Sequence, residues 1–597
     1  MHLRTTTLTL ISLLLLPGCE VFPPERPENP DCGDYTYVMQ YISWLAQKEM
    51  AQHDVVGLSI ALVDDQEVVW SQGFGYADKS QERPATPDTL YRVGSISKLF
   101  TTMAALQLVE HGRLSLDDPL RNYLPELSLR TRPGIGNDIS VRQLATHHAG
   151  LPRDLSAGMW GDRVASPSSI VAALNDQYME LPPGYAFSYS NVGMSLLGEV
   201  VSRVSGRPFA QQLQLELLRP LGMLHSRFSA QVPEQPQMAH SYKAGREKRD
   251  ADLRDIAAGG LVSSVNDMSR FISMVFAEGG NGNRQILSQA TMAEMLSKQN
   301  HNNELDLDQE TGLAWMLGHP QLDYAGKVAS HDGSTELFQA SLMLLPEHKL
   351  GVIAMANSDT GLPVVTRLAV ETLRLALEAK RGIAPPDDAV PLPEPGTLTA
   401  ELREPYLGWW TTSVGAVRIT QAGESLRIHV SDSTLNLDPR DDGYLALNHR
   451  LFGLIPLDLG ELGEYGFAQT EIGGVQRLIA KQGDRRYLVG SKVSPTPIPP
   501  SWHARLGEYR LQNAAGPLVL LDRVRLEELD GFLLVELEAE GERSRTILRP
   551  LDDTHALLLE RFAHYGTMVE VQQLAGRETL SWSGLQFVPA GESGDLL

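Results

Sequence analysis

A proline-rich segment, RGIAPPDDAVPLPEPGTL, divides the sequence into two parts of different composition. Proline fixes φ and lacks a backbone N–H, so we expect an extended linker over residues 381–400. Before it, helical patterns alternate with apolar runs typical of strands, whereas short alternating runs such as AVRITQ and SLRIHVS follow it. The chain is therefore expected to be an α+β domain followed by all-β modules.

Strand patterns stand at the two ends of the first part, and helical patterns lie between them. Residues 57–78 predict two strands joined by a polar turn, and residues 335–359 predict two more. Between them, SKLFTTMAALQLVEHG repeats its apolar residues at helical spacing and ends at Gly112, a residue type typical of helix C-caps. A last helical pattern covers 363–380. This order predicts one domain over residues 36–380, an antiparallel sheet flanked by helices.

The second part is itself divided by a proline-rich break, SPTPIPP at 494–500. Similar phrases stand near the start of each half, YLGWW at 406–410 and RLGEY at 505–509. We expect two related barrel-like β-modules, over residues 401–493 and 501–597.

The N-terminus has the pattern of an export signal. One arginine precedes an apolar run from Leu8 to Leu16, which is too short to span a bilayer as a permanent helix. The residues before Cys19 resemble the lipobox of bacterial lipoproteins, although Pro17 is unusual there; an ordinary signal cut nearby is the alternative. The resemblance implies a signal peptide over 1–18, a lipidated Cys19 on a tether over 19–35, and a place in the bacterial cell envelope.

Charge and cysteine content limit the partners of the chain. Lys and Arg total 51 against 74 Asp and Glu, a net charge of −23, which argues against nucleic acid and anionic lipid headgroups. Only two cysteines occur, so no disulfide framework is expected. A lipidated Cys19 would leave Cys32 as a free thiol; a bridge between the two is the less favoured alternative.

Ser95 and Lys98 stand three residues apart at the start of a predicted helix, in VGSISKLFTT. A serine hydroxyl is a weak nucleophile at neutral pH, and helix positions i and i+3 share a face, so the lysine amine can take the serine proton. The positive end of the helix is expected to lower the pKa of Lys98. The alternative is an ordinary polar first turn, but Lys98 is the only lysine with serine three residues before it.

A second candidate motif is Tyr189-Ser190-Asn191, after the turn LPPG. A phenol beside an ammonium ionises more readily, so Tyr189 is a candidate to relay the proton to the leaving group, and Asn191 to orient the lysine and bind a substrate amide. The same residues also fit a helix N-cap. A competing triplet beginning at Ser264 lacks the phenol and fits an N-cap better.

A third candidate motif is His331-Asp332-Gly333, which leads into a predicted strand. Gly333 would let the substrate approach the strand backbone, and the N–H groups of Ser334 and Ser95 are candidates for an oxyanion hole. The alternative is a polar loop before an edge strand.

These three motifs, in this order, resemble those of the penicillin-recognising serine hydrolases, which include class C β-lactamases, low-molecular-weight penicillin-binding proteins, esterases and D-aminopeptidases. GLSIALV, LATHHAGLP and AAGGLVSS match this family as well. The resemblance covers residues 50–375. It implies that Ser95 is acylated, that Lys98 and Tyr189 move protons, and that the N–H groups of Ser95 and Ser334 hold the oxyanion.

The third motif departs from the family pattern. β-Lactamases and carboxypeptidases usually have lysine and then a hydroxyl residue there, which hold a substrate carboxylate, whereas this chain has His331 and Asp332. We therefore expect a D-aminopeptidase-like or esterase-like hydrolase of small peptides, amides or esters. β-Lactamase or DD-carboxypeptidase activity is the alternative.

Cofactors and metals are not expected. His147 and His148 are adjacent, so they point apart on a strand or helix, and no other metal motif accompanies them. A rival hypothesis of another class is a non-catalytic envelope protein that binds peptidoglycan or a partner through its β-modules. Trp409, Trp410 and Trp502 are candidate binding-face aromatics for it, although core packing is commoner for such residues.

Overall fold

The computed structural model describes residues 22–27, 31–161, 164–282, 284–384, 386, 394–451, 455–457, 463–513, 521–539, 541–574 and 576–590. The predicted signal peptide, Cys19 and residues 385 and 387–393 of the predicted linker lie outside these residues. Among the described residues, no helix has both the length and the apolar composition needed to cross a membrane.

The first domain is built on one antiparallel eight-stranded sheet with the order β13-β14-β15-β16-β17-β1-β2-β3. In chain order its strands are β1 Gly57–Asp64, β2 Glu67–Asp78, β3 Arg83–Pro84, β13 Glu310–Thr311, β14 Met316–Leu317, β15 Ala329–Ser334, β16 Gln339–Leu345 and β17 Leu350–Ala356. Leu58 pairs with Ala356 and Phe74, so the first strand of the domain lies between its second strand and its last. The strands predicted at the two ends of the domain thus meet in one sheet, as expected.

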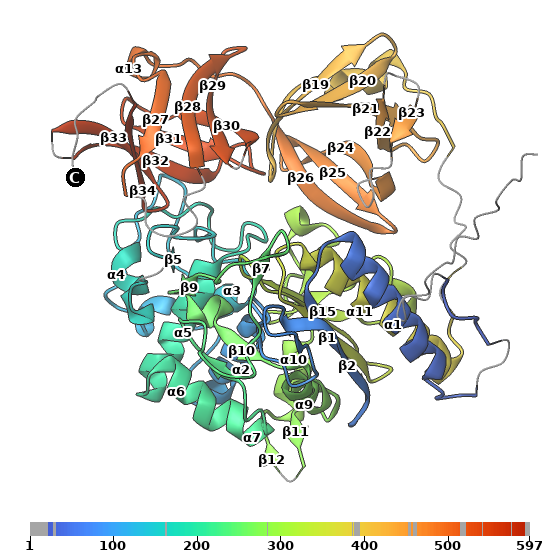
Figure 1. The fold of residues 1–597 in the computed structure, drawn as a ribbon. Helices are drawn as coiled ribbons and strands as arrows, with labels where there is room; N and C mark the ends of the chain where they lie inside the picture. The colour runs from blue at the N-terminus through green and yellow to red at the C-terminus, as the bar shows by residue number, and fades with distance from the viewer. Residues whose placement is uncertain are drawn as a thin grey trace, which may run out of the picture.

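Helices cover both faces of the sheet (Figure 1). They are α1 Thr36–Gln52, α2 Ser97–Glu110, α3 Val141–Ala145, α4 Ile170–Leu174, α5 Asn191–Ser205, α6 Phe209–Leu213, α7 Arg219–Leu221, α8 Ile256–Gly259, α9 Val265–Phe276, α10 Gln289–Met295 and α11 Gly361–Arg381. Helices α1 and α11 pack on one face around Ile42, Leu368 and Val352, all fully buried. Helices α2, α5 and α9 bury the other face in a larger core that includes Phe100 and Phe271. The predicted α+β class is confirmed.

The rest of the chain forms two β-barrels. In barrel 1, β21 also pairs with β22, which closes a ring of β18 Gly408–Thr412, β19 Gly415–Ala422, β20 Ser425–Val430, β21 Ser433–Pro439, β22 Leu445–Leu451, β24 Gly466–Ile472, β25 Val475–Gln482 and β26 Arg485–Val493, with β23 Ile455–Leu457 added to β22. Barrel 2 is closed by β27 Gly507–Leu511, β28 Leu521–Leu529, β29 Phe532–Ala539, β30 Glu542–Pro550, β31 His555–Leu559, β32 Gly566–Leu574, β33 Arg577–Trp582 and β34 Leu585–Pro589. The two predicted β-modules are therefore both closed barrels.

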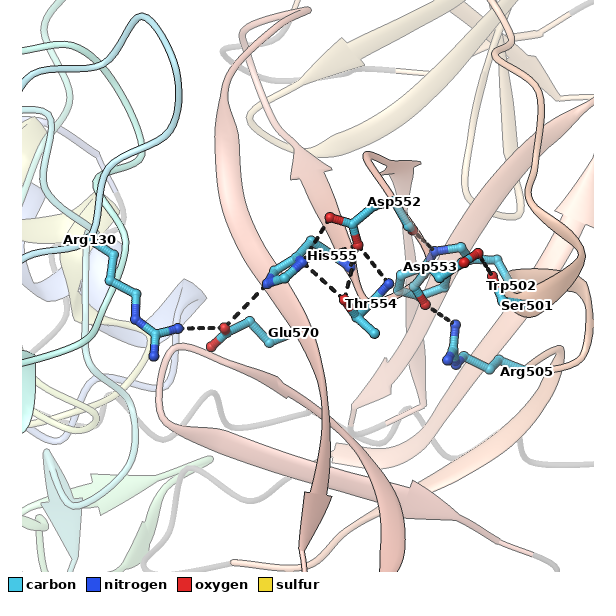
Figure 2. A network of polar contacts seen from close by, with 9 residues as sticks. All are labelled: Arg130, Ser501, Trp502, Arg505, Asp552, Asp553, Thr554, His555 and Glu570. Carbon is cyan, nitrogen blue, oxygen red and sulfur yellow. Dashed lines mark hydrogen bonds and ion pairs between the residues drawn. The ribbon is translucent and has the colours of Figure 1, made fainter.

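Both barrels lie side by side against one end of the first domain (Figure 1). Arg485 on β26 forms an ion pair with Asp323, and Arg130 of the first domain forms one with Glu570 on β32, with Nη1 and Oε1 2.7 Å apart. Figure 2 shows that this second ion pair belongs to a longer polar network, which reaches α13 (Pro500–His503) through the turn 551–554.

The tryptophans singled out in the sequence do not form an exposed binding face. Trp410 and Trp502 are fully buried, and Trp409 is 9% exposed. Trp409 packs against Phe532 of the other barrel, with 5.5 Å between ring centroids. These tryptophans pack inside the protein, so the suggestion that they form a binding face is wrong.

Candidate active site

Ser95 lies in a tight turn between β4 (Tyr91–Arg92) and α2. Lys98 N donates to Ser95 O at 2.9 Å, so the residue sits on the first turn that leads into the helix. The turn needs Gly94, whose φ is +55° and whose Cβ, if it had one, would lie 2.3 Å from the backbone nitrogen of Ser334. The start of the helix is thereby held against the third motif.

Lys98 is buried directly below Ser95. Its Nζ lies 3.0 Å from Ser95 Oγ and donates to Ala258 O at 2.8 Å. Burial lowers the pKa of Lys98 to about 7, because the ammonium loses its water, and the charge of Asp154 opposes this only in part. Desolvation is the main cause. A neutral amine can accept the Ser95 proton while Ala258 O fixes its position.

Tyr189 lies across the site from the lysine. Lys98 Nζ is 4.8 Å from its ring centroid, and the His147 ring stacks on it at 4.3 Å. Burial raises the pKa of Tyr189 to about 12, and hydrogen bonding with Ser95 offsets this only in part. The expectation of an easily ionised phenol is therefore wrong, because burial destabilises the phenolate. Tyr189 is a neutral O–H donor at neutral pH.

The rest of the second motif anchors this tyrosine. Ser190 is the N-cap of α5: its Oγ accepts from Gly193 N at 2.9 Å and donates to Pro152 O at 2.6 Å. Asn191 Nδ2 donates to Asp154 Oδ1 at 2.7 Å, and Lys98 is oriented by Ala258 instead. The predicted N-cap is confirmed, and so is that of Ser264 on α9, whose Oγ accepts from Asp267 N.

The third motif is strand β15, which packs directly on the turn that carries Ser95. A Cβ on Gly333 would lie 1.8 Å from Val93 O and 3.0 Å from Ser95 N, so only glycine fits. The Ser95 and Ser334 backbones are thereby brought together beside the serine hydroxyl, as an oxyanion hole requires.

The side chains of this motif carry no positive charge at neutral pH. His331 Nδ1 lies 2.6 Å from Asp332 O, its Nε2 is buried without a partner among the described residues, and burial lowers its pKa to about 3. Asp332 lines the open pocket and its surface is exposed there. The protein groups packed around its carboxyl nevertheless desolvate it and raise its pKa. The third motif thus presents a neutral imidazole, that of His331, and a carboxyl group, that of Asp332, to the pocket.

A pocket of about 640 Å³ joins these motifs. The candidate residues that line it are Ser95, Tyr189, Asn191, His331, Gly333 and Ser334. Lys98 lies beneath its floor. Sequence reasoning missed other lining residues, which include Arg153, Asp154, Trp160, Phe187, Met316 and Glu336. Arg153 and Asp154 directly follow LATHHAGLP, and Phe187 and Glu336 stand within three residues of the second and third motifs, so these phrases were the available signals. Trp160 and Met316 are brought in by folding alone.

The two adjacent histidines support the second motif. His147 Nδ1 accepts from Ser190 N at 3.1 Å, and burial holds the pKa of His147 well below its usual range. His148 Nε2 lies 2.8 Å from Asp306 Oδ2, whose other oxygen accepts from Phe187 N at 2.7 Å. Both histidines thus fix the segment that ends at Tyr189.

The barrels also reach this segment. Arg561, in the loop between β31 and β32, donates from Nη2 to Phe187 O at 3.0 Å. Its own carbonyl accepts from Ser491 Oγ on β26 at 2.6 Å. One residue thereby connects barrel 2, barrel 1 and the segment that ends at Tyr189, a contact that nothing in the sequence indicated.

Comparison with known proteins identifies the family of this chain. The pattern of the Beta-lactamase family matches residues 43–376. The chain is 24% identical over 339 residues to Protein flp of Staphylococcus aureus, a match that covers 54% of this chain and 63% of that protein. It is also 24% identical to Beta-lactamase-like protein 2 of Dictyostelium discoideum, over 73% of this chain and 82% of the relative.

Two solved structures share the fold. The octameric penicillin-binding protein homologue from Pyrococcus abyssi aligns with a TM-score of 0.50 at 23% identity, over 88% of this chain and 98% of that one. SurE aligns with a TM-score of 0.53 at 24% identity, over 75% of this chain and 98% of its own. Because the family pattern spans more than half of the sequence, this chain belongs to the Beta-lactamase family of serine hydrolase-like proteins.

Proposed function

We propose that this protein hydrolyses a peptide, amide or ester bond through an acyl-enzyme on Ser95. The observation that carries the proposal is the buried Lys98, whose Nζ lies 3.0 Å from Ser95 Oγ and whose pKa is lowered to about 7. A base with a pKa near the working pH is the one best suited to proton transfer.

In the first step Lys98 takes the Ser95 proton while Oγ bonds to the substrate carbonyl carbon. The backbone N–H groups of Ser95 and Ser334 receive the oxyanion. Tyr189 gives its proton to the leaving amine or alcohol as the bond to carbon breaks, and it recovers one from the Lys98 ammonium. Water then attacks the acyl-enzyme, releases the acid and restores Ser95.

The charges of the pocket favour a substrate without a carboxylate at the third motif. His331 is neutral, and the lining carries three acids, Asp154, Asp332 and Glu336, against Arg153. A D-aminopeptidase-like or esterase-like substrate fits this balance better than a β-lactam or a DD-peptide, whose carboxylate needs a cation. A panel of a nitrophenyl ester, a D-alanyl anilide, a chromogenic cephalosporin and a peptidoglycan peptide separates these classes.

The test of the nucleophile is labelling with a fluorophosphonate probe. We expect Ser95→Ala to abolish labelling and Ser425→Ala, at an exposed serine of barrel 1, to leave it unchanged. Equal labelling of Ser95→Ala and the parent chain would remove Ser95 from this role.

A second proposal concerns location: export to a bacterial envelope with a lipid on Cys19. It rests on the N-terminal sequence alone. Incorporation of labelled palmitate into the parent chain but not into Cys19→Ala would support it, and equal incorporation would refute it.

The rival function is a binding or scaffold protein. A shortened chain that ends at residue 380 and hydrolyses substrate as fast as the full chain would limit the barrels to binding or stability. Because Arg561 holds the backbone of Phe187, we expect the shortened chain to lose turnover even where it folds.

A further inference from the structure

Barrel 1 is hollow. A cavity of about 680 Å³ lies inside its ring, and each of the eight strands contributes to the wall. Apolar residues of the strands that line it are Val417, Ile428, Val430, Leu435, Leu447, Phe467, Leu478, Ala480 and Val489, and Val414 and Tyr465 line it as well. Five of them, Val430, Leu435, Leu447, Phe467 and Val489, are only partly buried although they point into the barrel. Each packs against the core of the barrel on one side and leaves part of its apolar surface open to the cavity.

Barrel 2 provides the comparison, because it has the same number of strands and a filled interior. Leu533, Val569, Leu580 and Phe587 are buried in its core, together with Trp502 from α13, which fills one end. Trp502 Nε1 donates to Asp552 O at 2.7 Å, and the network in Figure 2 holds this helix in place. Eight strands are thus enough to make a packed barrel in this chain, and the cavity of barrel 1 comes from its own side chains.

The cavity has a floor and a mouth. Trp410 and Tyr406 close one end of barrel 1, with Trp410 Nε1 donating to Tyr406 O at 2.8 Å. The other end is lined by the turns at 412–414 and 431–433 and by residues 541–543 of barrel 2. The space is therefore a cup with an apolar interior and a polar rim.

The rim is acidic overall. Asp432 and Glu542 stand there against one base, Arg543, whose Nη1 lies 3.8 Å from Asp432 Oδ2 and whose Nε lies 3.4 Å from Glu538 Oε2. Because Arg543 already faces two carboxylates, a ligand with its own carboxylate would meet repulsion at the rim. Serine hydroxyls at 413, 431 and 433 offer hydrogen bonds to an uncharged polar group.

We propose that barrel 1 binds a single-chain lipid-like molecule, with its alkyl chain in the cup and an uncharged polar head at the rim. The cavity lies within the size range of small-molecule sites, and an alkyl chain would cover the apolar surfaces that the barrel leaves open. This site is separate from the Ser95 pocket, and the proposal does not depend on the proposed hydrolysis.

The test is a titration of the full chain with the uncharged fluorescent probe N-phenyl-1-naphthylamine, followed by competition with glycerol monolaurate. We expect saturable binding of the probe and its displacement by the monoglyceride. Val430→Trp places an indole in the cavity and should weaken probe binding at least tenfold. Arg427→Trp, on the exposed outer face of the same strand, should leave it unchanged.

Further measurements distinguish a filled cavity from a failure to fold. The thermal transition and far-ultraviolet circular dichroism show whether Val430→Trp folds, and Leu435→Phe is a milder variant that also reduces the cavity. Absence of saturable probe binding would overturn the proposal. Failure of the monoglyceride to displace the probe would also overturn it, and so would unchanged probe affinity in folded variants whose cavity is filled.

Discussion

Gly333 and Val93 are in direct backbone contact: a Cβ on residue 333 would lie 1.8 Å from the Val93 carbonyl oxygen. This contact joins the strand of the third motif to the turn that carries Ser95. The relative position of the two proposed oxyanion donors, Ser95 N and Ser334 N, therefore depends on one missing side chain.

The first prediction follows from this contact. Gly333→Ala forces β15 away from the turn, and we expect kcat/KM for a nitrophenyl ester to fall about 100-fold or more, the usual loss for one oxyanion donor. Gly136→Ala is the control, because its Cβ would meet nothing within 4 Å. Normal turnover by a correctly folded Gly333→Ala variant would show that the contact does not set the site.

The second prediction concerns pH. Because only the neutral Lys98 amine accepts the serine proton and its pKa is lowered to about 7, kcat/KM should rise from pH 5 and level off above pH 8. Tyr189 must stay protonated, and its pKa of about 12 places any fall far above the plateau. A rate profile in several buffers at constant ionic strength checks this. A profile that falls between pH 6 and 9 would contradict the assigned roles.

The third prediction separates positioning from catalysis. Arg561→Ala removes the donor to Phe187 O, two residues before Tyr189, so we expect kcat to fall about tenfold while KM changes little, since misplacement of a reacting group costs about this much or more. Arg561→Lys should recover part of the loss, which a purely structural defect would not. The exposed Arg510, also in barrel 2, gives the control Arg510→Ala. Equal kcat in all of these variants would exclude the positioning role.

The fourth prediction concerns the stability of barrel 2. Trp502 is fully buried and donates to Asp552 O, so Trp502→Ala should lower the free energy of unfolding of this barrel by about 3–5 kcal/mol. Denaturant unfolding followed by circular dichroism measures the change. Trp502→Phe, which keeps most of the packing, should lose less. An identical loss in the two variants would mean that packing is not the main contribution.

Much of the fold could be predicted because its elements have strong local patterns. The helices α2 and α5 end near glycines, and each strand pair at the domain ends is joined by a polar turn, so local sequence places them. The pairing of β18 with β26, which barrel 1 needs to close, could not be placed in the same way, because these two strands are distant in the chain.

The candidate site was less accessible to sequence reasoning. The three motifs supply part of the pocket lining, but the pKa of Tyr189 is set mainly by burial, which no spacing reveals. The partner of Lys98 is a main-chain carbonyl, and any residue type at position 258 supplies one. Arg561 lies 374 positions from Phe187 in the chain. Such contacts exist only once the domains have assembled.

The two closed barrels have a consequence for solubility. An open sheet presents unpaired backbone groups at its edges, which invite strands of other molecules to add and start aggregates. A closed ring has no such border, and the described edges of the eight-stranded sheet are the two-residue strands β13 and β3, the latter ending in Pro84. Among the described residues, the rings of the two barrels thus contribute no free edge except at β23, whereas β2 of the eight-stranded sheet is paired with β3 only at Tyr76 and Asp78.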